Sequence, residues 1–342
     1  MEKKARYKVT VKCCTYNQAT YITDALNGFV IQETDFPFVC CVIDDASTDG
    51  EQEVIKKYVA ENFNLSEPNI AYEKETDDAH ITFARHKSNK NCFFAVLYLK
   101  RNLYNDNQKK LGLISEWTEN SEYIALCEGD DYWTNASKLR MQVDFLDSNP
   151  DYGMSHTDFD LVEGKRNHSI IIHKDGNYWP YSLTEGLQVG TLTVVLRSSV
   201  YNTLPKLFMD KDWPMSDKPL WIEVSRFSKI HYLPIVTAKY RILESSASHG
   251  SFDKLVKFLN CSADISDYYA DKFGVHIEER EQSKSYHECI MRFACRFSSR
   301  EAADVELREA IKHKCVSVKL LLFYIGAKHN IVKKIIMQFR SL

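Results

Sequence analysis

Hydrophobic and polar positions along the chain follow two periods that predict strands and helices in turn. Residues 9–14 have the length of a strand, and residues 38–43 form a continuous apolar run, which is typical of a strand buried on both faces. After each run, apolar residues recur at helical spacing. The order strand, helix, strand, helix predicts a parallel sheet with right-handed crossovers.

The rest of the chain divides into two parts by its pattern. Up to about residue 250 we expect two more helices, at 93–103 and 137–146. We also expect further strands, at 70–73, 123–127, 153–159, 169–172, 192–196, 231–233 and 236–241. From about residue 251 the pattern is helical. We therefore expect a Rossmann-like, mostly parallel α/β domain over residues 1–250 and a helical extension over 251–342 that packs on it.

Composition narrows the class of protein. The formal net charge is −3, which does not suggest a nucleic-acid binder. The ten cysteines include adjacent pairs inside strand-like runs and form no CxxC pair, so we expect reduced core thiols rather than disulfides or a zinc site. The first eight residues are charged and precede no segment suited to a secretion signal, and no run approaches the ~20 apolar residues of a membrane span. We expect a cytoplasmic protein.

The C-terminal segment is basic and amphipathic. No Asp or Glu follows Glu309, whereas lysines continue to the end. One helical face there contains Ile331, Val332, Ile335, Ile336 and Phe339. Two interpretations stay open: a helix packed on the catalytic domain with a solvated basic edge, or a helix that makes peripheral contact with an anionic membrane surface.

Two acidic clusters follow two of the predicted strands. Asp44 and Asp45 end the second strand, and Glu128, Asp130 and Asp131 follow the central one. Because ligands of open parallel sheets bind beyond the carboxyl ends of the strands, these carboxylates suit a phosphate-bearing ligand held through a divalent cation, Mg²⁺ or Mn²⁺. Taken alone, either cluster can also be an acidic turn after a strand.

Three classes of function remain open on these residues. The first is a metal-dependent transferase that uses a nucleotide-activated donor. The second is a phosphotransfer protein, but its phosphatase version needs Asp-x-Asp after the strand, and Ala46 occupies the position two after Asp44. The third is a non-catalytic binding or scaffolding protein. A dinucleotide dehydrogenase is disfavoured because no G-x-G-x-x-G follows the first strand.

Motifs in a characteristic order carry a family resemblance. They lie at residues 9–18, 42–49, 123–133, 138–146, 149–153, 156–158, 216–221, 229–234 and 240–241. Together they span roughly residues 8–250, and the chain resembles a bacterial family 2 glycosyltransferase of the GT-A fold. The resemblance implies an inverting enzyme that uses a nucleotide-diphospho-sugar, with a UDP-sugar favoured.

The resemblance also implies a donor site around the first acidic cluster. Thr15, Tyr16 and Asn17 would border the nucleotide base, with Tyr16 as its stacking partner. Asp45 would accept a hydrogen bond from the base, and Asp44 would shape the same loop.

A metal site, a diphosphate contact and a base are implied as well. Asp130 would be the principal metal ligand, with Glu128 in place of the first aspartate of the family's Asp-x-Asp. Asp131 would lie beside the metal or the donor sugar. Lys90 and Asn91 would lie near the diphosphate.

Asp217 matches the family's general base, which would deprotonate an acceptor hydroxyl. No Gln-x-x-Arg-Trp motif is present, so we expect one sugar per encounter rather than processive synthesis. The expected acceptor is a hydroxyl of a glycan or a lipid-linked molecule, in cell-surface polysaccharide biosynthesis at the inner face of the membrane. The alternative is a catalytically inactive GT-A-like nucleotide-binding or scaffolding protein.

Overall fold

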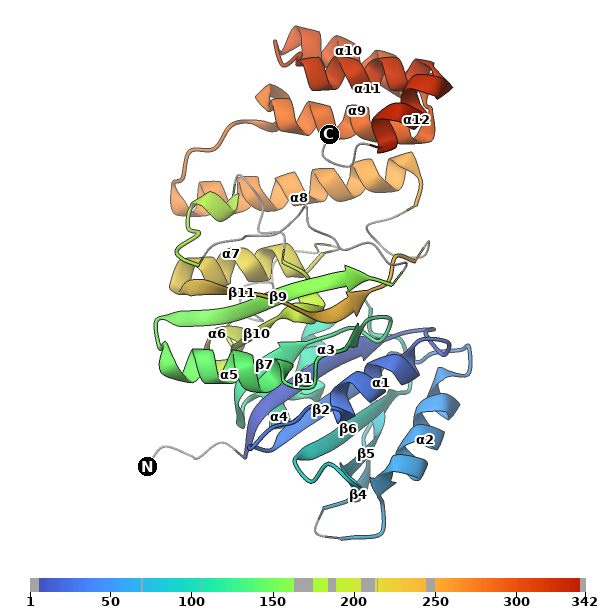
Figure 1. Ribbon diagram of the computed structural model, residues 1–342, viewed down its shortest axis with the longest axis vertical. Helices are drawn as coiled ribbons and strands as arrows, with labels where there is room; N and C mark the ends of the chain where they lie inside the picture. Colours follow the sequence, from blue (N-terminus) through green and yellow to red (C-terminus); the bar gives the residue numbers. More distant parts are fainter. Residues whose placement is uncertain are drawn as a thin grey trace. The chain divides into compact units, whose positions relative to one another are not determined.

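The computed structural model (Figure 1) describes residues 6–68, 70–104, 106–162, 175–183, 189–203, 213, 215–243 and 250–338. The chain forms two compact units. The first contains Met1–Trp179, Leu187–Asp212 and Leu220–Arg241, and the second contains Pro180–Gly186, Trp213–Pro219 and Ile242–Leu342. The expected division into domains at residue 250 stays a prediction.

A mixed sheet forms the frame of the first unit. Its strands are β1 (Tyr7–Thr15), β2 (Phe38–Asp44), β3 (Phe63–Asn64), β4 (Tyr72–Glu75), β5 (Ala79–His86), β6 (Cys92–Leu99), β7 (Ser121–Leu126), β8 (Tyr132–Trp133), β9 (Tyr152–Leu161), β10 (Val195–Arg197) and β11 (Lys229–Tyr240). Within the described residues, the strand order is β3-β5-β6-β2-β1-β7-β10-β9-β11-β8, with β4 paired to β5. The four strands β6, β2, β1 and β7 are mutually parallel, and β9 pairs in parallel with β11.

Helices cover both faces of this sheet. They are α1 (Ile22–Val30), α2 (Glu51–Asn62), α3 (Asn107–Leu113), α4 (Ser115–Thr118), α5 (Lys138–Ser148), α6 (Ser198–Tyr201) and α7 (Asp217–Phe227), of which the first three residues of α7 belong to the second unit. Helices α1, α2 and α5 pack their apolar residues on one face of the central strands. On the other face, α4 packs against β2 and β6, while α6 and α7 pack against β7.

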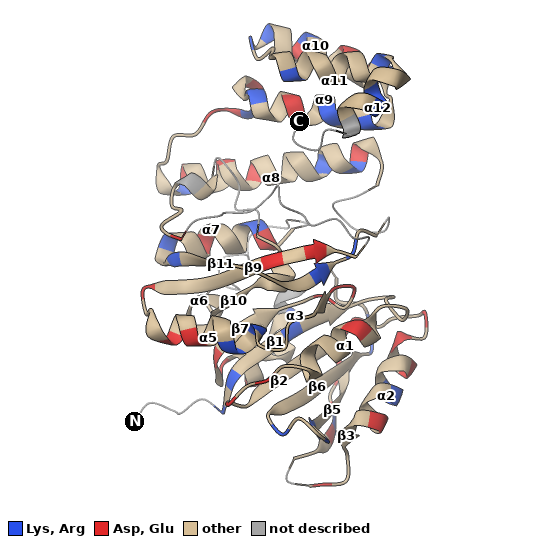
Figure 2. Cartoon of the chain, viewed as in Figure 1, with Lys and Arg blue, Asp and Glu red and all other residues tan. Residues whose placement is uncertain are grey.

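The structure confirms the mostly parallel α/β architecture with flanking helices and a helical C-terminal region. The helix expected at residues 93–103 is wrong, because β6 occupies that segment. Strand β6 carries no charged residue (Figure 2) and is almost entirely buried between two covered faces, so its sequence shows neither strand alternation nor helical period. The two short strands expected at 231–233 and 236–241 are one bulged strand, β11, which ends at Tyr240. The strand expected at 169–172 lies outside the described residues.

The second unit is helical. It contains α8 (Phe252–Phe273), α9 (Lys284–Phe297), α10 (Arg300–Lys312), α11 (Val318–Lys328) and α12 (Asn330–Gln338). Helices α8 to α11 each begin after a serine whose hydroxyl accepts a hydrogen bond from a backbone N–H of the first turn, as an N-cap does. Small and apolar side chains of α9, α10, α11 and α12 form its core.

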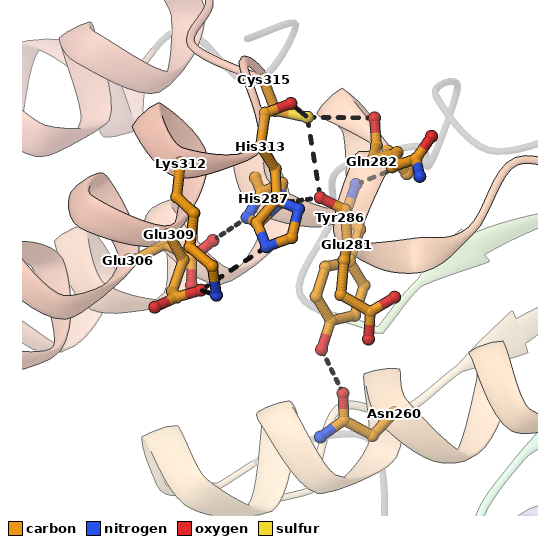
Figure 3. A network of polar contacts seen from close by, with 11 residues as sticks. Asn260, Glu281, Gln282, Tyr286, His287, Glu306, Glu309, Lys312, His313 and Cys315 are labelled. Carbon is orange, nitrogen blue, oxygen red and sulfur yellow. Dashed lines mark hydrogen bonds and ion pairs between the residues drawn. The ribbon is translucent and has the colours of Figure 1, made fainter.

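A buried polar network joins the helices of this unit (Figure 3). The ring of His287 on α9 contacts a carboxylate oxygen of Glu306 on α10 at 2.5 Å through Nδ1. Its Nε2 lies 2.9 Å from the carbonyl oxygen of Glu281, so this nitrogen donates. The thiol of Cys315, ahead of α11, donates to the carbonyl of Gln282 at 3.0 Å. The network therefore ties α9, α10 and the segment before α9 together.

Across the described residues, none of the helices combines the length and apolar character needed to cross a membrane.

Candidate active site

The loop that follows β7 carries Glu128, Asp130 and Asp131 and packs against the end of β1. The backbone N–H of Gly129 donates to the carbonyl of Cys14 at 3.0 Å, which continues the pairing of the two strands into the loop. A Cβ atom at Gly129 would collide with the side chain of Thr15, so only glycine fits this close approach. The acidic loop and the loop after β1 are therefore held against each other.

Arg241, directly after β11, holds the acidic loop in place. Its backbone N–H donates to Asp131 Oδ1 at 2.8 Å, and its guanidinium donates to the carbonyl of Asp130 at 2.6 Å. The same guanidinium pairs with Asp24 of α1 and lies over the ring of Tyr132 at 4.7 Å from the centroid. One arginine thus joins β11, α1 and the acidic loop. In the sequence, Arg241 belongs to one of the family motifs, but that motif gives it no role.

The two aspartates of this loop sit in an environment that disfavours two negative charges. Asp131 is buried and Asp130 half-buried. Burial raises the pKa of Asp130, and burial together with the charge of Asp130 raises the pKa of Asp131 well above its usual range. A cation between them would relieve this repulsion.

The donor set therefore fits a divalent cation. Carboxylate oxygens are the ligands that Mg²⁺ and Mn²⁺ prefer, and such ions commonly take one or two carboxylates and complete their shell with phosphate oxygens and water. Within the part of the chain that the structure describes, no cluster of three or more His, Cys, Asp or Glu side chains is arranged as a complete metal site. A cation here would share the donor's phosphates.

Glu128 has a cationic neighbour that the sequence did not single out. Lys12 lies in the middle of β1, and its backbone pairs with Leu126, the last residue of β7, two residues before Glu128. Burial works against the charged form of Lys12, but the groups around it, among them Tyr201 and Glu128, outweigh burial and raise its pKa. A protonated lysine therefore accompanies the carboxylate of Glu128.

The loops after β1 and β2 are joined by a hydrogen-bond network. The backbone N–H of Asn17 donates to Ser47 Oγ at 2.9 Å, and that of Thr48 donates to Asn17 Oδ1 at 2.8 Å. Tyr16 is 47% exposed, so its ring is accessible to a ligand. Thr15 is buried and donates to Glu51, the first residue of α2.

Glu51 is a site residue that the sequence analysis missed. Its Oε2 accepts from the backbone N–H of Gln18 at 2.9 Å and from Ser47 Oγ at 2.8 Å. Burial raises its pKa, while hydrogen bonds from Thr15, Gln18 and Ser47 oppose the rise. Glu51 thus fixes both loops. Glu51 is the first residue of a helix, three residues after a Ser-Thr pair. Acidic residues are common in the first turn of helices, so the sequence gave no reason to place Glu51 in the site.

Asp44 and Asp45 are both buried at the end of β2. Asp44 Oδ1 accepts from Gln52 Nε2 at 2.6 Å and from the backbone N–H of Ser47. Asp45 is engaged on both oxygens: Oδ1 accepts from the N–H of Leu103 at 2.6 Å, and Oδ2 pairs with Lys110 Nζ of α3 at 2.5 Å. A base that hydrogen-bonds to Asp45 would share an oxygen with one of these donors or replace it.

Lys90 and Asn91 are not brought to this edge of the sheet. They precede β6, whose first residue pairs with Phe38 at the start of β2, whereas Asp44 ends β2. Over the seven residues of β2 that separation is roughly 20 Å. Asn91 Nδ2 donates to the carbonyl of Thr34 at 2.6 Å, so its contacts are those of a structural turn.

Asp217 is the first residue of α7 and belongs to the second unit. It is half-buried, its Oδ1 accepts from the N–H of Lys218 at 2.8 Å, and burial raises its pKa. Lys218 donates to the carbonyl of Ser262 at 2.6 Å and to Ser266 Oγ at 2.7 Å, and burial lowers its pKa to about 8. Asp217 is thus a carboxylate with raised proton affinity, as a general base requires.

A fully buried lysine lies behind the acidic loop. Lys138, the first residue of α5, donates to Gln142 Oε1 at 2.7 Å and to the carbonyl of Thr193 at 3.2 Å. Its Nζ lies 4.5 Å from the ring centroid of Trp133. These partners are uncharged, and burial lowers the pKa of Lys138 to about 7. Lys138 thus contacts Trp133 of β8. In the sequence it stood out only as part of a family motif.

The arrangement defines a class of protein. The carboxyl ends of β1, β2 and β7 meet at one edge of the sheet, where an exposed tyrosine, a buried acidic pair and a second acidic loop lie together. This is the edge at which open α/β sheets bind their ligands. The class is an α/β protein with an acidic, metal-compatible ligand site.

Comparison with known proteins gives the family. The model of the family described as Glycosyl transferase family 2 matches residues 10–200, which is more than half of the 342 residues. The chain belongs to glycosyl transferase family 2. The uncharacterized proteins Rv1520 of Mycobacterium tuberculosis (strain ATCC 25618 / H37Rv) and Mb1547 of Mycobacterium bovis are each 29% identical over 265 residues, 73% of this chain and 63% of theirs. The chain therefore spans less than two thirds of the length of these relatives.

Two solved structures show distant similarity. S. aureus TarS 1-349 in complex with UDP-GlcNAc is 16% identical with a TM-score of 0.48, over 94% of this chain and 79% of TarS. Mannosyltransferase PcManGT from Pyrobaculum calidifontis, in complex with GDP-Man and Mn²⁺, is 12% identical with a TM-score of 0.43, over 98% and 88% of the two chains. At these TM-scores the likeness says nothing about individual site residues.

Proposed function

We propose that this protein is an inverting glycosyltransferase that moves one sugar from a nucleotide-diphospho-sugar, with a UDP-sugar favoured, to a hydroxyl of a glycan or lipid-linked acceptor. The observation that carries the proposal is the acidic loop of Asp130 and Asp131, which is held against the loop that ends β1 at the carboxyl edge of the parallel strands. Membership of the family supports glycosyl transfer. The reaction would take place on the cytoplasmic side, at the inner face of the membrane, in cell-surface polysaccharide biosynthesis.

The loops after β1 and β2 would bind the nucleoside. Tyr16 is exposed enough to stack on the base, and Thr15 and Asn17 fix the loop that presents it. Asp45 would accept a hydrogen bond from a ring N–H of the base on an oxygen shared with Leu103 or Lys110, or in place of Lys110. Asp44 keeps its bonds to neighbouring groups and shapes the loop.

The acidic loop would hold the diphosphate end of the donor. Asp130 would be the principal ligand of a Mn²⁺ or Mg²⁺ ion, with Asp131 beside it. When bound, the ion would neutralise charge that develops on the departing diphosphate. Glu128, next to the cation of Lys12, would contribute to the loop's charge balance or reach the metal through water.

Asp217 would act as the general base. It would accept the proton of the acceptor hydroxyl as that oxygen forms a bond to the anomeric carbon. The bond between that carbon and the diphosphate oxygen would break on the opposite face, and the nucleoside diphosphate would leave. The configuration at the anomeric carbon is therefore inverted, through an oxocarbenium-like transition state.

Asp217→Asn tests the base. We expect donor binding to be unchanged, because the residues proposed to bind the nucleotide belong to the first unit, and sugar transfer to fall by about 10²–10⁴-fold. Transfer is measured as nucleoside diphosphate released after a screen of nucleotide-sugars has identified the donor. Asp253→Asn, which removes an exposed carboxylate from the first turn of α8, is the matched control. Unchanged transfer in Asp217→Asn rejects the base assignment.

Asp130→Asn tests the metal-linked donor site by calorimetric titration with UDP, with and without Mn²⁺. We expect Mn²⁺ to strengthen UDP binding to the wild-type protein and to have little effect on the variant. Asp144→Asn, at an exposed position on α5, is the control and should behave as wild type. Equal Mn²⁺ dependence in both variants argues against Asp130 as a ligand.

The occupied carboxylate of Asp45 favours the second candidate, a catalytically inactive nucleotide-binding or scaffolding protein. If Lys110 closes the base site permanently, UDP does not bind with or without Mn²⁺. Lys110→Met then restores binding only if the rest of the site is intact. Absence of UDP binding thus indicates a scaffold, whereas UDP binding without sugar transfer from any nucleotide-sugar in the screen indicates an inactive nucleotide-binding protein.

A further inference from the structure

Helix α11 carries an apolar stripe that is exposed among the residues that the structure describes. Its buried face contributes Leu320, Phe323 and Ala327 to the core of the helical unit. The other face exposes apolar side chains at helical spacing i, i+3, i+4 and i+7: these are Val318, Leu321, Leu322 and Ile325. Val318 is 77% exposed, and the other three are more than a third exposed. Neighbouring apolar residues exposed together on one helix mark an interaction surface rather than scattered surface hydrophobics.

Helix α12, which packs against α11, also exposes apolar side chains. The face predicted from the sequence is divided by the structure: Ile336 is buried in the helical core and Val332 packs against it, whereas Ile331 is 77% and Ile335 52% exposed. Phe339 lies outside the described residues. The exposed residues Val318, Leu321, Leu322, Ile325, Ile331 and Ile335 are called here the α11–α12 face.

The charged side chains that α11 and α12 themselves carry have one sign. Helices α11 and α12 carry lysines and no carboxylate (Figure 2). Lys334 is exposed next to Ile335, and Lys333 donates to Ser298 Oγ. The nearest acidic partners belong to other helices: Asp304 of α10 pairs with Lys328 at 2.6 Å, and Glu288 of α9 lies 3.8 Å from Lys319.

This charge pattern indicates what kind of partner binds the α11–α12 face. A second copy of the chain docked through the same face would set lysines against lysines around an apolar centre, which costs free energy. An anionic phospholipid surface offers opposite charge at its headgroups and apolar depth below them. Lysine side chains can extend along the apolar surface while their ammonium groups reach the headgroups.

We propose that the α11–α12 face docks this protein on an anionic membrane surface, with its six apolar side chains inserted at the headgroup boundary and Lys334, next to Ile335, against the phosphates. The face belongs to the helical unit alone, so the proposal does not depend on sugar transfer. It deepens the expected peripheral membrane contact by assigning it to a defined surface, most of which lies on α11 rather than on the terminal helix.

Vesicle co-sedimentation of the full chain tests the proposal. Sucrose-loaded vesicles of phosphatidylcholine mixed with phosphatidylglycerol are compared with vesicles of phosphatidylcholine alone, at low and high salt. We expect binding to the mixed vesicles, weakened by salt and by the absence of phosphatidylglycerol. Leu321→Ser with Ile325→Ser should weaken binding by about tenfold or more, because each removes an inserted apolar side chain. Lys334→Glu should weaken it about fivefold or more.

The matched control is Val305→Ser with Ile311→Ser, which removes two exposed apolar side chains from α10. It should bind vesicles as the wild-type protein does, and circular dichroism of both double variants should match the wild type. Failure to bind the mixed vesicles, or equal loss in both double variants, overturns the proposal. A second copy of the chain is the partner instead if the wild-type protein does not bind vesicles and light scattering shows that it is a dimer. In that case the α11 double variant should be monomeric and the α10 double variant should remain a dimer. No donor is present, so none of these outcomes bears on glycosyl transfer.

Discussion

Lys138 makes the stability of this protein depend on pH in a direction that can be calculated. It is fully buried with the neutral oxygens of Gln142 and Thr193 as partners, and burial lowers its pKa from 10.5 to about 7. Between these two values the unfolded chain binds a proton at this residue that the folded chain does not, so the free energy of unfolding rises with pH. The full effect is about 5 kcal/mol, or about 1.4 kcal/mol for each pH unit within the window.

Lys138→Met removes this dependence. Urea unfolding followed by tryptophan fluorescence, at several pH values from about 7 to about 8.5, gives the free energy of unfolding of each protein. The wild-type value minus the variant value should rise by about 2 kcal/mol over that range. Buried thiols such as Cys13 and Cys127, whose pKa values are raised by burial, oppose the rise at higher pH, but they do so in both proteins.

Arg140→Met is the control for this experiment, because Arg140 lies on the same helix but is exposed. Its stability should run parallel to that of the wild type at every pH. If the difference between wild type and Lys138→Met stays constant within about 0.5 kcal/mol, Lys138 is not held neutral by burial and the reasoning is refuted.

Two further predictions concern the residues that organise each unit. Arg241→Met should lower the free energy of unfolding by about 1.5–3 kcal/mol, because the loop of Asp130 loses the hydrogen bond from the guanidinium. It should also weaken UDP binding. Unaltered UDP affinity in calorimetry would show that Arg241 does not support the ligand site. His287→Ala should destabilise the helical unit by about 3–5 kcal/mol because it leaves Glu306 buried without its partner, whereas His313→Ala, whose contact to Glu309 is 3.7 Å long, should cost less than about 1 kcal/mol. Thermal unfolding by circular dichroism measures both, and equal effects of the two histidine variants would contradict the assigned role of the buried pair.

The local sequence pattern was sufficient to predict the position of those site residues that lie at the ends of strands. Asp44 and Asp45 follow β2, the acidic loop follows β7, and parallel pairing of both strands with β1 brings them to one edge. That placement follows from chain order and the handedness of crossovers alone. The same reasoning failed for β6, because a strand buried on both faces has no alternation to reveal it.

The contacts that shape the site join residues far apart in the chain. Lys110 and Asp45 are 65 residues apart, and Arg241 and Asp131 are 110 apart. No periodic signal links such pairs, since each depends on which side chain the packed strands and helices bring within hydrogen-bond distance. Lys90 and Asn91 show the opposite case. Their positions in the sequence suggested a contact with the diphosphate, but they precede β6 and lie at the edge of the sheet opposite Asp44.

The sequence by itself determined the family, the parallel core and the two acidic clusters, because order along the chain and side-chain period are properties of short segments. Tertiary structure alone decided that Asp45 is already paired, that Arg241 and Glu51 hold the loops, that Lys138 is buried, and that the exposed apolar face lies on α11 as well as α12. Charge state and exposure depend on every neighbour in three dimensions, and those neighbours come from distant parts of the chain.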